Sequence, residues 1–130
     1  MTLRITDFRK QIKIEVIIGQ CHTNPFYEES KRQLAKAISG LCGGCTLVDS
    51  TGDWVEDAGK TRAFRFDTDD LIEEDTVHIV LTTEENKFEG VYNDLQRIVA
   101  VWGSMNNLDI NWVHCVVTES RGAHFNVGNK

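Results

Sequence analysis

Three stretches of the chain alternate between apolar and polar positions, and two others carry apolar residues at helical spacing. The alternating stretches are residues 12–18 (IKIEVII), 76–82 (TVHIVLT) and 111–119 (NWVHCVVTE). A period of two residues predicts strands with one buried face. Residues 46–48 and 51–55 are also rich in β-forming residues, so they predict a fourth strand region.

Two helices are predicted between these strands. The first begins at Asn24, a good N-cap, with Pro25 at the first helical position, and Gly40, Gly43 and Gly44 supply its end. The second begins near Thr82, whose spacing to Glu85 fits a capping box. The apolar stripe of the second helix consists of Phe88, Val91, Leu95, Ile98 and Trp102.

A β-hairpin is predicted after the first helix. Residues 46–55 form its first arm, residues 56–59 (EDAG) its turn and residues 61–66 its second arm. An acidic loop, residues 67–75 (DTDDLIEED), then leads into the strand at 76–82.

The order of these elements predicts an α+β fold. It is that of a ferredoxin-like split βαβ sandwich, with an antiparallel sheet, a β-hairpin insertion and two helices on one face. A chain of 130 residues reads as a single domain, residues 1–130, with a core at 10–119 and a loose tail at 120–130.

The other face of this sheet would be too apolar to face water. It would carry Lys13, Glu15, Ile17, Thr76, His78, Val80, Trp112, His114 and Val116. Self-association, as a symmetric ring or dimer, is the preferred way to cover it.

Composition narrows the class of partner. The net charge of −6 argues against nucleic acid or an anionic membrane, and it would suit a small cationic ligand. The chain contains no run of 18 consecutive apolar residues, so no membrane-spanning helix is predicted. Residues 1–13 are rich in charged residues and lack the apolar core of a signal peptide. We therefore expect a cytoplasmic protein whose four cysteines are thiols.

The pair Cys42-Gly-Gly-Cys45 does not predict redox or metal chemistry. A redox pair places its first thiol at a helix N-terminus, whereas this pair follows a helix C-terminus. A zinc site needs about two further ligands, and Cys21 and Cys115 stand alone in the sequence. Buried or incidental thiols are the favoured interpretation, and no metal or cofactor is expected.

Three histidines and two glutamates are candidates for chemistry. His78 and His114 would flank the first strand, where a core or interface role is favoured over a metal or proton-transfer role. His22 precedes the first helix, at an end of the sheet that often holds ligands. Glu73 and Glu74 belong either to a solvated loop or to a cleft, where a desolvated carboxylate could hold a cation or handle protons.

The chain resembles two protein groups. The resemblance rests on Gly44, Thr46, Gly52 and Trp54 in the run GGCTLVDSTGDW, on residues 22–25 (HTNP), and on residues 73–80 (EEDTVHIV). It covers about residues 12–118. The two groups are a family of uncharacterised bacterial ferredoxin-like domains and the bacteriophage S-adenosylmethionine lyases.

The lyase resemblance implies a homotrimer that binds substrate between subunits. Trp54 stands at the position of an aromatic substrate-binding residue, and Glu74 is the best match for the family's glutamate, with Glu73 second. The chain inserts residues 64–72 between the two positions, so Glu56 remains a further alternative. Asp53 and His22 complete the substrate-binding candidates.

The implied reaction cleaves S-adenosylmethionine into 5′-methylthioadenosine and L-homoserine lactone by intramolecular displacement. A phage enzyme of this kind would deplete the methyl donor in the host cytoplasm and counteract methylation-dependent defence. Two alternatives stay open: a non-enzymatic ferredoxin-like trimer that binds a nucleotide-like ligand or a partner protein, and a structural oligomer without a ligand.

Overall fold

The structure, a computed structural model, describes residues 2–20, 28–56, 66–108 and 110–128. Its strands are β1 (Arg9–Gln20), β2 (Thr46–Trp54), β3 (Ile72–Thr83) and β4 (Ile110–Gly122). Its α-helices are α1 (Glu28–Cys42) and α2 (Phe88–Met105). Two short 3-10 helices, η1 (Ile5–Asp7) and η2 (Glu85–Lys87), precede β1 and α2.

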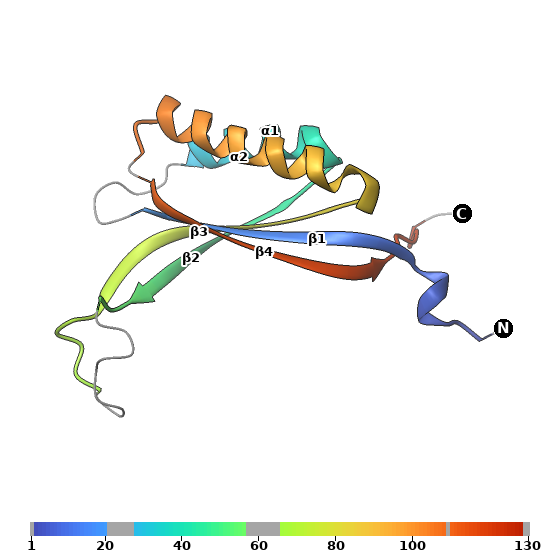
Figure 1. Cartoon of the computed structure of the whole chain (residues 1–130), viewed down its shortest axis with the longest axis horizontal. Coiled ribbons are helices and arrows are strands. Elements are labelled where there is room, and N and C mark those ends of the chain that lie inside the picture. Colours follow the sequence, from blue (N-terminus) through green and yellow to red (C-terminus); the bar gives the residue numbers. More distant parts are fainter. Residues whose placement is uncertain (1, 21–27, 57–65, 109, 129–130) are drawn as a thin grey trace.

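The strands form one antiparallel sheet in the order β2-β3-β1-β4. Both α-helices lie on one face of this sheet, and the ends of β2 and β3 bend away on the side opposite the helices (Figure 1). This arrangement confirms the predicted α+β, ferredoxin-like class.

The core lies between the helices and the two central strands. In the ladder between β1 and β3, Ile14 pairs with Leu81, Val16 with Ile79 and Ile18 with Val77, and all six side chains are buried. The helices contribute Leu34, Ile38, Val91, Leu95, Val99 and Trp102. Alternation along the central strands therefore selects the face that the helices cover.

Two polar contacts tie α1 to its neighbours. The indole nitrogen of Trp102 donates a hydrogen bond of 2.6 Å to the carbonyl oxygen of Ser30, which joins α2 to α1. The Lys31 ammonium, on a side chain only 9% exposed, lies 2.8 Å from a carboxylate oxygen of Asp49 on β2 and 2.7 Å from Glu28. The hydrogen bonds that Lys31 donates to Asp49 and, with a smaller effect, to Glu28 raise the pKa of Lys31 above its ordinary value.

The prediction of an acidic loop at residues 67–75 is partly wrong. β3 begins at Ile72, so Glu73, Glu74 and Asp75 are strand residues, because they continue the ladder with residues 51–53 of β2. In the described part of the chain, β2 pairs with β3. Of the predicted second arm at 61–66, Phe66 is not in a strand and residues 61–65 lie outside the described part of the chain.

The predicted helix boundaries also change. Thr82 lies in β3 opposite Lys13, so the predicted capping box is wrong, and α2 begins at Phe88 after η2. α1 runs through Gly40 and ends at Cys42, where Gly43 adopts a φ of 93° that favours glycine. The predicted N-cap at residues 24–25 lies outside the described residues.

β4 extends to Gly122, because residues 120–122 pair with β1 instead of beginning the tail.

The strand register confirms the composition of the uncovered sheet face, which we call the open face. Ile17 of β1 pairs with His78 on one side and with His114 on the other, and Glu15 pairs with Val80 and Val116. Gly19 pairs with residues 76 and 112 in the same way. No helix in the described part of the chain is long and apolar enough to cross a membrane.

Candidate ligand site on the open face

The site begins where β2 and β3 end. Gly52 pairs with Glu74, and Trp54 pairs with Ile72. Because every second residue of a strand lies on the same face, Trp54 and Glu74 are diagonal neighbours on the open face.

The two side chains differ in exposure. Glu74 is only 4% exposed although the helices lie on the other side of the sheet, whereas Trp54 is 36% exposed. Next to Glu74 along β3, the Thr76 hydroxyl is buried and hydrogen-bonds the Ser50 hydroxyl of β2. A carboxylate this deep interacts more strongly with a nearby cation than one in bulk water does, because the local dielectric constant is lower.

A hollow of about 380 Å³ lies beside Trp54, and Glu74 is not among the described residues that line it. Gly52, Asp53 and Trp54 line one side of it, and His114 of β4 lines the other. β2 and β4 are the opposite edges of the sheet. The bend of the β2 and β3 ends away from the helices therefore makes the open face concave (Figure 1).

Two basic side chains of the open face lie close to Glu15 of β1. The His78 imidazole lies 3.6 Å from a carboxylate oxygen of Glu15, and the Lys13 ammonium lies 3.7 Å from the same oxygen. His78 and His114 occupy one row of the sheet, with Ile17 between them. This row adjoins the hollow through His114, which lines the hollow together with Trp54.

The other glutamate candidate lies elsewhere. Glu73 is exposed and pairs with Asp53, on the face of the strands opposite to that of Trp54 and Glu74. Like charges directly opposite one another disfavour pairing. Asp53 also lines the hollow, so it adjoins the site from the edge strand.

The two remaining candidates are Glu56 and His22. Glu56 lines a separate hollow of about 280 Å³ together with Asp69 and Asp70. His22 lies outside the described residues, so its role stays a prediction.

The three cysteines in the described part of the chain lie away from the open face. Cys42 and Cys45 flank the end of α1, and Cys115 faces the helices from β4; these three are free thiols. Burial raises the pKa of the Cys115 thiol. Within the described ranges, no three His, Cys, Asp or Glu side chains gather closely enough to hold a metal ion.

The sequence analysis favoured a core or interface role for His114, which here lines the hollow. Alternation along residues 111–119 already placed it on the open face, but not opposite Trp54. The missing information was the bend of the sheet, which no local pattern encodes. Together, an aromatic face, a buried carboxylate and an imidazole suit a cation that also carries a flat ring.

Comparison with known proteins defines the class by fold. The chain matches no protein-family model and no curated protein sequence. Its structure is similar to that of CutA from Synechococcus elongatus PCC7942 complexed with a Bis-Tris molecule, with a TM-score of 0.51, 12% identity and coverage of 85% of this chain and 81% of CutA. It is also similar to a phage SAM lyase in complex with S-methyl-5′-thioadenosine, with a TM-score of 0.44, 13% identity and coverage of 83% and 90%. These likenesses concern the ferredoxin-like fold and identify no activity.

Proposed function

We propose that the chain is an S-adenosylmethionine lyase, with its site on the open face around Trp54 and Glu74. The observation that carries the proposal is the placement of these two residues: they are diagonal neighbours across β2 and β3, and Glu74 is buried whereas Trp54 is partly exposed. The sequence resemblance singles out the same two positions. The net charge of −6 is consistent with a cationic substrate.

Each residue of this pair suits one part of the substrate. Glu74 holds the substrate's ammonium or hydroxyl groups, and Trp54 stacks on the adenine or faces the sulfonium. A cation held against an aromatic face is stabilised by about 0.5–2 kcal/mol. We assign Glu74 rather than Glu73 because Glu73 is exposed on the opposite face.

The chemistry needs positioning more than it needs a nucleophile from the protein. The substrate's own carboxylate oxygen attacks the methylene carbon bonded to sulfur, a C–O bond forms, and the C–S bond breaks. The electron pair of the C–S bond passes to sulfur, so the products are neutral methylthioadenosine and homoserine lactone, and no proton is transferred. Holding the two reacting atoms together can lower the barrier by about 7–11 kcal/mol.

The site is completed by other copies of the chain. Val48, Trp54 and Val116 are exposed on the open face, and a second copy would bury them. Such a copy would also exclude water from the carboxylate of the substrate. A homotrimer with sites between its subunits therefore forms part of the proposal.

The test is to incubate the purified protein with S-adenosylmethionine in H₂¹⁸O and to separate the products by chromatography with mass detection. The proposal predicts methylthioadenosine together with a lactone that, when analysed before it hydrolyses, carries no ¹⁸O. Homoserine that already carries one ¹⁸O when the first product appears would indicate attack by water. Binding without turnover would instead support the non-enzymatic, ligand-binding trimer.

A further inference from the structure

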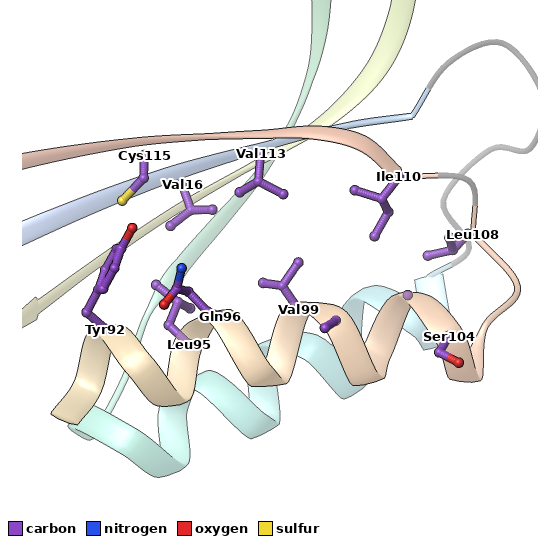
Figure 2. A pocket seen from close by; sticks show the side chains of 12 residues that line it. Val16, Tyr92, Leu95, Gln96, Val99, Ser104, Leu108, Ile110, Val113 and Cys115 are labelled. Carbon is purple, nitrogen blue, oxygen red and sulfur yellow. The ribbon is translucent and has the colours of Figure 1, made fainter. Parts of the chain in front are cut away.

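A second cavity lies on the helix-covered face of the sheet, away from the open face. The two α-helices leave part of this face of the four-stranded sheet uncovered. The helix-facing residues Val113 and Val117 of the edge strand β4 are 45% and 46% exposed. Between β4 and α2 lies a cavity of about 470 Å³ (Figure 2). This volume is within the usual range of small-molecule sites, about 300–1,000 Å³.

The walls of the cavity are apolar and uncharged. Leu95 and Val99 of α2 face Ile110 and Val113 near the start of β4, as Figure 2 shows. Among the described residues that line the cavity, none carries a formal charge at neutral pH. A charged ligand would lose its hydration there without gaining a partner, so the lining selects a neutral molecule.

Three polar groups gather at one end of the cavity. In Figure 2 the Tyr92 hydroxyl and the Gln96 amide point from α2 toward the strands, and the Cys115 thiol points toward Tyr92. Burial raises the pKa of Cys115, so its thiol stays protonated and neutral at physiological pH. An apolar cavity with a few convergent polar groups is the usual form of a site that fixes the orientation of a ligand.

We propose that this cavity binds a neutral, mainly apolar small molecule with a flat body and one hydroxyl or amide group. The flat body lies between α2 and β4, and the polar group hydrogen-bonds Gln96 and Tyr92. The site is separate from the S-adenosylmethionine site and does not depend on lyase activity.

Equilibrium dialysis with 2-naphthol and naphthalene tests the proposal, because the two probes differ only in a hydroxyl group. We expect saturable binding of one 2-naphthol per chain, about 3- to 10-fold tighter than that of naphthalene. The substitution Gln96→Leu should remove most of this difference while keeping naphthalene binding.

Two neighbouring residues of α2 provide a matched pair of variants. Ala100 is exposed and lines the cavity, so Ala100→Trp should fill it and abolish binding. Val101 lines a different groove, between α1 and α2, so Val101→Trp should leave binding unchanged. Binding lost in Val101→Trp and kept in Ala100→Trp would overturn the assignment.

Alkylation supplies a readout that does not rely on affinity. Bound 2-naphthol should slow the reaction of Cys115 with iodoacetamide and leave that of Cys42 unchanged, as measured by peptide mass mapping. The proposal is overturned by absence of saturable binding. It is also overturned if binding falls with rising protein concentration in step with self-association, because a second copy of the chain would then be the occupant.

Discussion

Glu73 and Glu74 are adjacent in the sequence, yet they lie in different environments. Glu74 is buried on the open face beside Trp54, whereas Glu73 is exposed on the opposite face beside Asp53. Their separation follows from the two-residue period of a strand. As long as both residues are interpreted as part of a loop, nothing distinguishes them. The start of β3 at Ile72 places them on opposite faces of the sheet.

Also at the scale of the residue, substitutions of Trp54 test the proposed contact between its ring and the substrate. Trp54→Leu removes the π face, so we expect the KM for S-adenosylmethionine to rise about 2- to 30-fold, with a smaller change in kcat. Trp54→Phe keeps an aromatic face and should recover much of the loss. Steady-state kinetics on the three proteins provide the measurement, and equal KM values for the Leu and Phe variants would contradict an aromatic contact.

At the scale of elements, alternation and helical spacing predicted the central strands, the helix-facing residues of β1 and β3, and most of the buried stripe of α2. They failed at the boundaries. Thr82 reads locally as a helix cap, but pairing with Lys13 keeps it in β3. The acidic residues 73–75 read as a loop, but the β2 ladder makes them a strand. Both errors arise because strand pairing with distant residues overrides a local signal.

The contact between α1 and β2 gives a prediction about pH. The raised pKa of Lys31 means that its stabilising contribution is complete below about pH 10.5 and is lost as the pH rises through the higher folded-state pKa. Relative to Lys31→Met, wild-type protein should therefore lose free energy of unfolding in that alkaline range, as measured by urea denaturation. Asp49→Asn should reduce the pH dependence, and parallel curves for wild type and Lys31→Met would contradict the assignment.

At the scale of the whole molecule, the helices cover one face of the sheet, and the proposed trimer would cover the other. We expect the protein to sediment as a trimer. Val48 is 50% exposed on the open face, and Val48→Glu should dissociate the trimer and remove activity with it. Val101→Glu, on the outer surface of α2, is the matched control and should remain trimeric. An active monomer would show that the site does not need a second subunit.

The measurement that tests the account most directly is the rate of methylthioadenosine formation by wild type, Glu74→Gln and Glu73→Gln. Replacing the buried carboxylate should lower kcat/KM by about 30- to 100-fold, because an interaction with the cationic substrate is lost. Replacing its exposed neighbour should change kcat/KM by less than about 3-fold. Wild-type protein that forms no methylthioadenosine, or variants with the opposite order of activity, would contradict a lyase site built on Glu74.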